Sequence, residues 1–150
     1  MNVVKLAPEG VIEIYSAQVE IFLELPFVCG GISAGFPSPA DDYLDSGMDL
    51  NEELIKNPST TFYGRVKGLS MKDDGIFPND ILVVDKSLEP KNGDLAVCYI
   101  DGEFTLKRIT KKKDCIYLMP ANSEYKPVKV TAENNFIVWG VVTYVIKKTR

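Results

Sequence analysis

Residues 95–110 read LAVCYIDGEFTLKRIT, and this stretch decides the fold. Two runs of apolar and β-branched residues, 95–100 and 103–110, flank the dipeptide Asp101-Gly102. These two residue types readily adopt the positive φ angles that a tight two-residue turn requires. The stretch therefore predicts a β-hairpin.

Similar runs lie on both sides of this hairpin. Each is short and ends in turn-forming residues such as Asp74-Gly75 or Asn92-Gly93. About seven short strands at this spacing predict a mainly β protein with a closed or curled antiparallel sheet, and not a parallel α/β sheet. The predicted strands are residues 61–68, 80–85, 93–100, 103–110, 115–120, 126–130 and 136–148.

The amino-terminal part of the chain has a different composition. Residues 11–15 and 21–28 contain alternating apolar residues, which indicate extended segments. Residues 29–39, CGGISAGFPSP, are rich in Gly, Ser and Pro and are typical of a linker that a protease can reach.

One or two helical turns are predicted between this linker and the first strand of the β region. Ser38 or Asp41 can cap the first turn, and Asp49 can cap a second that ends at Asn57-Pro58. At 150 residues, the chain fits one domain with a proper hydrophobic core.

The composition excludes several classes of function. The chain has no histidine, so Ser-His-Asp and Cys-His proteases and His-ligated metal sites are excluded. A net charge of −4 argues against sequence-independent DNA binding as the main task. The three cysteines, Cys29, Cys98 and Cys115, form no C-x-x-C pair, so neither a zinc site nor a disulfide framework is expected. We expect no metal and no cofactor.

The apolar runs of the chain do not predict a membrane protein. They are far shorter than the roughly 20 residues that span a bilayer, and the first residues lack the pattern of a secretory signal. We therefore expect a cytoplasmic protein.

A hydrolase without histidine can activate a hydroxyl group with a neutral lysine, provided that burial lowers the lysine pKa. Ser70 lies in GLSMKDDG, between a predicted strand and a turn, and Lys107 lies in the apolar strand EFTLKRI. A simpler interpretation makes Ser70 a turn hydroxyl and Lys107 a solvent-facing residue on the face of Thr105 and Ile109. Composition and periodicity leave both interpretations open.

Five sequence blocks resemble the LexA/UmuD family of self-cleaving peptidases, and the resemblance runs from about Ala34 to Arg150. It implies a curled antiparallel β domain of the carboxyl-terminal, signal-peptidase-like type with an extended amino-terminal arm. Residues 1–34 would form the arm and cleavage linker, and residues 35–150 the peptidase and dimerisation domain. The blocks are GFPSPADDYLDSGMDLNEELIKNPS (35–59), GRVKGLSMKDDGIFPNDILVVD (64–85), NGDLAVCYIDGEFTLKRI (92–109), LMPANSEYKPV (118–128) and FIVWGVV (136–142).

The resemblance also implies the site residues. The family nucleophile in G-x-S-M falls on Ser70, and the general base in E-F-T-x-K falls on Lys107. Backbone N–H groups of Ser70 and Met71 would hold the oxyanion. The family cleaves its own chain at Ala-Gly or Cys-Gly. In UmuD-like members the scissile glycine precedes F-P-S-P, which favours Ala34-Gly35 and leaves Cys29-Gly30 as the alternative.

The implied function is a step of the SOS response. A RecA filament on single-stranded DNA would stimulate self-cleavage, and the processed homodimer would join a UmuC-like Y-family translesion polymerase. The amino-terminal arm is too short for a helix-turn-helix, so no direct sequence-specific DNA binding is expected. The alternatives are a non-cleaving polymerase adaptor of the same fold, a LexA-type or phage-type repressor fragment, and a signal-peptidase-like enzyme acting on other proteins.

Overall fold

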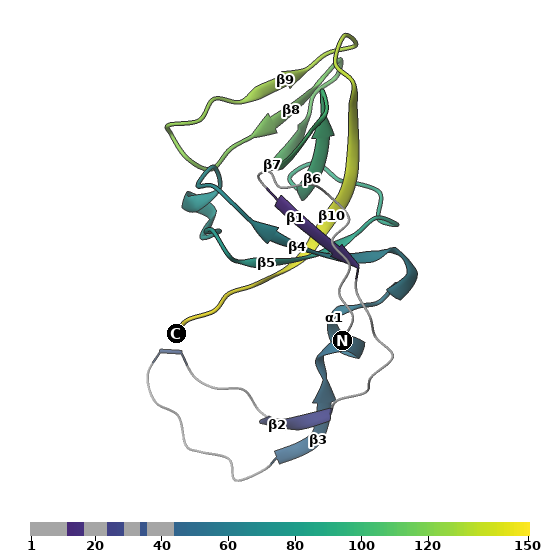
Figure 1. The fold of residues 1–150 in the computed structure, drawn as a ribbon, viewed down its shortest axis with the longest axis vertical. Coiled ribbons are helices and arrows are strands. Elements are labelled where there is room, and N and C mark those ends of the chain that lie inside the picture. Colours follow the sequence, from purple (N-terminus) through teal and green to yellow (C-terminus); the bar gives the residue numbers. More distant parts are fainter. Residues whose placement is uncertain (1–11, 17–23, 29–33, 36–43) are drawn as a thin grey trace. The chain divides into compact units, whose positions relative to one another are not determined.

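The computed structural model describes residues 12–16, 24–28, 34–35 and 44–150 (Figure 1). The chain divides into two compact units. The first comprises Met1–Gln18 and Asn57–Arg150, and the second comprises Val19–Lys56. Among the described residues, no helix is long and apolar enough to cross a membrane.

The first unit is built on one eight-stranded sheet whose neighbouring strands are all antiparallel. All seven strands predicted between residues 61 and 148 are present, so the mainly β, antiparallel fold class is confirmed. The strands are β1 (Ile12–Ser16), β4 (Thr61–Val66), β5 (Ile81–Asp85), β6 (Leu95–Ile100), β7 (Glu103–Lys111), β8 (Ile116–Met119), β9 (Val128–Val130) and β10 (Phe136–Ile146), and two 3₁₀ helices are η1 (Pro58–Thr60) and η2 (Lys72–Asp74). Their order in the sheet is β1-β4-β5-β10-β6-β7-β8-β9.

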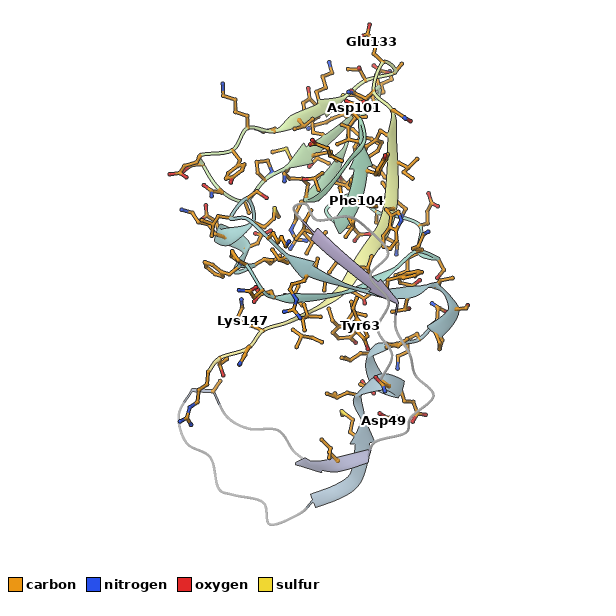
Figure 2. The ribbon with its side chains drawn as sticks, viewed as in Figure 1. Asp49, Tyr63, Asp101, Phe104, Glu133 and Lys147 are labelled. Atoms are coloured by element: carbon orange, nitrogen blue, oxygen red, sulfur yellow. The ribbon has the colours of Figure 1, made fainter. Side chains whose placement is uncertain are left out.

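The hairpin predicted at residues 95–110 is confirmed. Strands β6 and β7 pair along the whole of β6, and Asp101 and Gly102 alone form the turn. Their φ angles of 48° and 90° are both positive, as a type I′ turn requires. The Asp101 carboxylate accepts hydrogen bonds from Asn134 Nδ2 and the backbone N–H of Asn135. Figure 2 shows Asp101 and Glu133 at the same end of the sheet, where these bonds join the turn to the loop before β10.

The last strand, β10, lies in the middle of the sheet (Figure 1). It pairs with β5 on one side and with β6 on the other. The register with β6 shifts between Val138 and Gly140, which marks a bulge. A Cβ at position 140 would lie only 2.6 Å from Val84 Cγ1. Glycine therefore allows β10 to approach β5 closely at this bulge.

Buried apolar side chains form two clusters, and β6 and β7 contribute to both. Successive residues of a strand face opposite sides of a sheet, so both faces of these two strands are covered. The first cluster consists of Val66, Met71, Ile76, Leu82, Val84, Leu95, Val97 and Leu106, and the second of Ala96, Cys98, Ile109, Leu118 and Val130.

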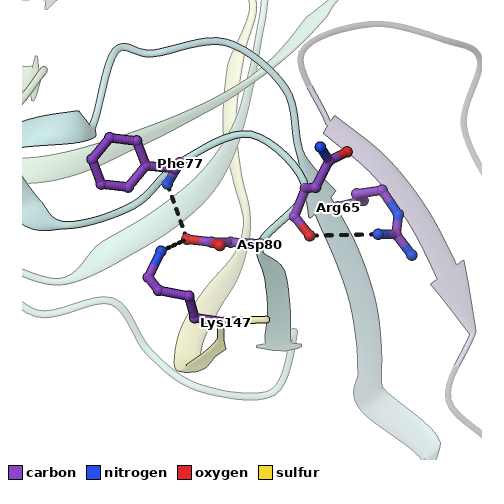
Figure 3. A network of polar contacts seen from close by, with 5 residues as sticks. Arg65, Phe77, Asp80 and Lys147 are labelled. Carbon is purple, nitrogen blue, oxygen red and sulfur yellow. Dashed lines mark hydrogen bonds and ion pairs between the residues drawn. The ribbon is translucent and has the colours of Figure 1, made fainter. Parts of the chain in front are cut away.

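The turn before β5 is tied to the chain that follows β10 (Figure 3). The buried Asp80 carboxylate accepts a hydrogen bond of 2.9 Å from the Phe77 backbone N–H and forms an ion pair with Lys147 Nζ. The same ammonium lies 5.0 Å from the centroid of the Phe77 ring, a cation–π contact. On the other side of the turn, Arg65 donates a hydrogen bond to the Asn79 carbonyl. These contacts fix the carboxyl end of the segment that joins β4 to β5.

The part of the second unit that the structure describes contains a strand pair and one short helix. Strand β2 (Glu24–Val28) pairs antiparallel with β3 (Leu44–Asp49), and α1 (Leu50–Leu54) follows directly. The helical turn predicted after Asp49 is confirmed, since its carboxylate caps the helix by accepting a hydrogen bond of 3.1 Å from the Asn51 N–H. The predicted turn capped by Ser38 or Asp41 lies outside the described residues.

Candidate active site

Ser70 lies in the segment between β4 and β5, just before η2. Gly68, two residues earlier, has a φ angle of 86°, which glycine adopts without strain. The Ser70 carbonyl accepts a hydrogen bond of 2.8 Å from the Ala121 N–H. The Leu69 carbonyl accepts another of 2.8 Å from Asn122 Nδ2. The loop after β8 therefore holds the backbone on which Ser70 sits.

Lys107 lies on β7, and only 8% of its surface is exposed. Its Nζ donates hydrogen bonds to Ser70 Oγ at 3.0 Å, Thr105 Oγ1 at 2.8 Å and the Leu106 carbonyl at 3.0 Å. Three bonds use every donor of an ammonium group. The structure thus brings together the serine and the lysine that stand out in the sequence, although they are 37 positions apart.

The alternative interpretation of Lys107 as a solvent-facing residue is wrong. It rested on strand alternation, which puts Lys107 on the same face of β7 as Thr105 and Ile109. Ile109 is fully buried in the second cluster. Because this face of the strand is covered as well, alternation does not predict exposure here.

Burial lowers the pKa of Lys107, because an ammonium group loses hydration inside the protein. No carboxylate among the described residues forms an ion pair with Lys107 that would oppose this effect. The Cys98 side chain would raise the pKa of Lys107 only if it carried the negative charge of a thiolate. Burial raises the pKa of Cys98 to about 12, so its thiol stays neutral near pH 7. Lys107 therefore loses its proton at a lower pH than an ordinary lysine.

Two backbone donors flank the Ser70 hydroxyl. Neither the N–H of Ser70 nor that of Met71 donates a hydrogen bond to any residue that the structure describes. The Met71 side chain is buried in the first cluster, which fixes the backbone here. Free N–H groups next to a nucleophile can stabilise negative charge that develops on a carbonyl oxygen. The arrangement combines a hydroxyl group, a readily deprotonated amine and free donors, which suits acyl transfer.

The residues of the predicted cleavage linker are described only in part. Ala34 and Gly35 form an exposed bend in the connection between β2 and β3. A Cβ at position 35 would meet no atom within 4 Å. The alternative pair, Cys29 and Gly30, lies outside the described residues.

Two residues that the sequence analysis did not assign to the site support its geometry. Thr105 accepts a hydrogen bond from the Lys107 amine. In the sequence, only its position two residues before Lys107, on the same face of a strand, indicates this contact. Asn122 is 5% exposed and bridges two segments, since its Oδ1 also accepts a hydrogen bond of 3.0 Å from the Glu124 N–H. No local pattern in the sequence places Asn122 beside Leu69.

Comparison with known proteins identifies a peptidase family, which agrees with the chemistry that this arrangement suits. Residues 26–143, a range that includes Ser70 and Lys107, match the family described as Peptidase S24-like. Protein MucA of Salmonella typhimurium is 41% identical over 122 residues, which cover 80% of this chain and 82% of MucA. Protein ImpA of Shigella flexneri is 39% identical over 131 residues, with coverage of 83% and 85%. Protein SamA of Salmonella typhimurium is 45% identical over 117 residues, with coverage of 78% and 81%.

Proposed function

This chain belongs to the peptidase S24 family, and from that membership we propose that it is a self-cleaving serine peptidase of SOS mutagenesis. Ser70 acts as the nucleophile and Lys107 as its general base. The observation that carries this assignment is the 3.0 Å contact between Ser70 Oγ and the buried Lys107 Nζ. Lysine accepts a proton only in its neutral form, which the lowered pKa of Lys107 favours.

The proposed reaction is an acyl transfer within the chain. Neutral Lys107 takes the hydroxyl proton of Ser70, and Ser70 Oγ attacks the carbonyl carbon of Ala34. The N–H groups of Ser70 and Met71 hold the oxyanion. The bond to Gly35 then breaks while the Lys107 ammonium returns its proton to the leaving amine. Water, deprotonated by Lys107, finally attacks the acyl carbonyl, and the Lys107 ammonium returns this proton to Ser70 Oγ as the bond to the acyl group breaks.

The three partners of the Lys107 amine suit this role. A neutral amine has two N–H groups and one lone pair. Thr105 Oγ1 and the Leu106 carbonyl can accept the two N–H groups, since both lie within 3.0 Å of Nζ. The lone pair then points to Ser70, whose hydroxyl becomes the donor. Thr105 is therefore a positioning residue that orients the base.

We place the scissile bond between Ala34 and Gly35, with Cys29-Gly30 as the alternative. Both residues of the favoured pair are exposed in the connection between β2 and β3, which suits a bond that must enter an active site. The sequence F-P-S-P directly after Gly35 supports the same choice. Cleavage there divides the chain into an arm, residues 1–34, and a body, residues 35–150.

The proposed partners follow from the resemblance to UmuD-like sequences. A RecA filament on single-stranded DNA promotes cleavage, and the body forms a homodimer that joins a UmuC-like translesion polymerase. The net charge of −4 supports action through protein partners rather than direct DNA recognition. Such partners imply that the protein works in the cytoplasm.

Self-cleavage is expected to speed up as the pH rises from 7 to about 10. The active base is neutral Lys107, so the rate should follow its deprotonation, with a midpoint below the ordinary lysine pKa of 10.5. The chain has no histidine to add a titration near neutral pH. Intact mass spectrometry of purified protein, sampled over time at each pH, measures the rate and should identify a fragment that begins at Gly35.

Ser70→Ala serves as the control in that experiment and should stay intact at every pH. A fragment that begins at Gly30 would overturn the assignment of the scissile bond. A wild-type chain as stable as Ser70→Ala, with and without a RecA filament, would contradict peptidase activity and support the adaptor.

Replacing Asn122 by alanine should slow self-cleavage by roughly tenfold to a hundredfold, because small displacements of a nucleophile are costly. The change removes the hydrogen bonds that join Asn122 to Leu69 and Glu124. Ser123→Ala, at the exposed neighbouring position, is the matched control. The rate at a fixed alkaline pH measures the effect, and an Asn122→Ala chain that folds and cleaves at the wild-type rate would contradict this role.

A further inference from the structure

The arm on the amino-terminal side of the proposed scissile bond carries two strands, and both have partners on the carboxyl-terminal side. In the first unit, β1 pairs with β4 over five positions, from Ile12↔Val66 to Ser16↔Phe62. In the second unit, β2 pairs with β3, from Glu24↔Asp49 to Val28↔Leu44. The bond between Ala34 and Gly35 lies in the connection between β2 and β3.

Cutting that bond breaks no strand pairing. The hydrogen bonds of β1 with β4 and of β2 with β3 run between main chains that the cut leaves intact. The freed arm would therefore keep one pairing with each unit. A two-stranded pair such as β2–β3 is weak alone, so the pairing of β1 with the large sheet carries most of the retention.

The edge of β4 is well suited to hold a separate strand. Strand β1 is the terminal strand of the sheet and pairs with β4 alone, so it can join or leave without disturbing another pair (Figures 1 and 3).

We propose that the edge of β4, Thr61–Val66, is a binding site for an extended strand, and that the chain's own β1 keeps this site occupied after cleavage. Cleavage and release of the arm are then two separate steps. This inference rests on the proposed function, because in the natural protein the cut would come from self-cleavage. Until the arm leaves, the backbone groups on this edge of β4 pair with β1. Once the arm has left, these groups are unpaired and form an open edge to which another strand can add.

The test compares two ways of cutting the same chain. In one, the wild-type protein cleaves itself at alkaline pH. In the other, a chain with Ser70→Ala and a recognition sequence for a specific protease in place of residues 36–42 is cut by that protease. Size-exclusion chromatography at neutral pH should show the arm eluting with the body in both cases. An arm that elutes as a free peptide directly after cutting would overturn the proposal.

The two routes keep the proposals distinguishable. If the wild-type chain does not cut itself but the protease-cut chain retains its arm, self-cleavage fails and the strand site stands. If the chain cuts itself and the arm is lost at once, the strand site fails and self-cleavage stands.

A variant of β1 tests whether its pairing with β4 is what retains the arm. Proline lacks an N–H, and successive N–H groups of a strand point alternately toward and away from a neighbour. The double change Glu13→Pro and Ile14→Pro therefore removes one N–H that faces β4. The matched control is Ala17→Pro with Gln18→Pro, beyond the last paired residue, Ser16.

We expect the β1 variant to weaken retention by roughly twofold to tenfold, the ratio for one lost hydrogen bond, and the control to retain its arm. Dilution of the cut protein before chromatography measures the difference. Hydrogen exchange shows whether the lost pairing is the cause, since those amides of Thr61–Val66 that face β1, and not those that face β5, should lose protection only in the β1 variant. Equal retention in the β1 variant and the control would overturn the proposal.

Discussion

Replacing Lys107 by methionine is expected to reduce the rate of self-cleavage by about a thousandfold or more, within the range that general-base catalysis contributes. Methionine keeps an unbranched side chain in the buried site but has no amine to accept the Ser70 proton. The contact of 3.0 Å between Nζ and Ser70 Oγ is the only one that the described residues provide between this hydroxyl and a basic side chain. Time courses at a fixed alkaline pH, followed by intact mass spectrometry, measure the loss.

Two further variants make this test specific. Lys107→Arg should be as inactive as Lys107→Met, because a guanidinium does not lose its proton in proteins. Lys111→Met is the matched control, since Lys111 lies on the same strand, is exposed and donates its hydrogen bond to the Pro90 carbonyl. It should cleave at the wild-type rate. A Lys107→Met chain that keeps more than about a tenth of the activity would contradict the role of general base.

Loss of activity in Lys107→Met should not come from unfolding. The pKa of Lys107 is lowered in the folded chain, so the unfolded chain binds this proton more tightly. At a pH below the pKa of Lys107 in the folded chain, the buried charge therefore lowers the free energy of unfolding. This cost decreases as the pH rises through that pKa, and it is gone above the pKa of the same lysine in the unfolded chain. The variant should be at least as stable as the wild type at pH 7.

Replacing Leu82 by alanine is expected to lower the free energy of unfolding by about 2–5 kcal/mol. Leu82 is fully buried on β5 in the first cluster, where neighbouring side chains on several strands limit how far the cavity can close. The loss is a large fraction of the roughly 5–15 kcal/mol that stabilises a typical domain. It should lower the melting temperature by roughly 2–4 °C for each kcal/mol lost.

Leu88→Ala is the control for the core substitution. Leu88 follows β5 and is 41% exposed, so its replacement should change the stability by less than about 0.5 kcal/mol. Urea denaturation followed by the fluorescence of Trp139 compares the two variants. Similar midpoints for Leu82→Ala and Leu88→Ala would contradict the assignment of Leu82 to the core.

The strands of the larger unit could be predicted because local chemistry and tertiary structure agree there. Apolar and β-branched runs form β4 to β10, and Asp101-Gly102 forms the turn that its residue types favour. Strand β3 was missed because LDSGMD is rich in residues that strands disfavour. Its pairing with β2 is a tertiary contact that no local pattern encodes.

The candidate site was predictable only in part. A sequence period assigns a strand residue to a face, but it does not report whether that face is covered. Lys107 is buried because the second cluster covers the face that it shares with Ile109. The proximity of Lys107 to Ser70 depends on how β7 meets the segment after β4, which is a tertiary contact. The family motifs could therefore suggest that Ser70 and Lys107 act together, whereas strand periodicity could not. Asn122 lies in the block LMPANSEYKPV (118–128), but neither that resemblance nor a local pattern assigns it a role.

The central place of β10 has a consequence for synthesis on the ribosome. One side of the sheet consists of β1, β4 and β5, next to Ser70, and the other consists of β6 to β9, with Lys107 on β7. Strand β10 lies between the two sides and follows all the other described strands in the sequence. Until residues 136–146 leave the exit tunnel, β5 and β6 lack their common neighbour and the two sides of the sheet are not joined by strand pairing. Non-local pairing of this kind forms late and slowly. The parts of the sheet next to Ser70 and around Lys107 are therefore joined by strand pairing only once β10 is available to pair with both β5 and β6.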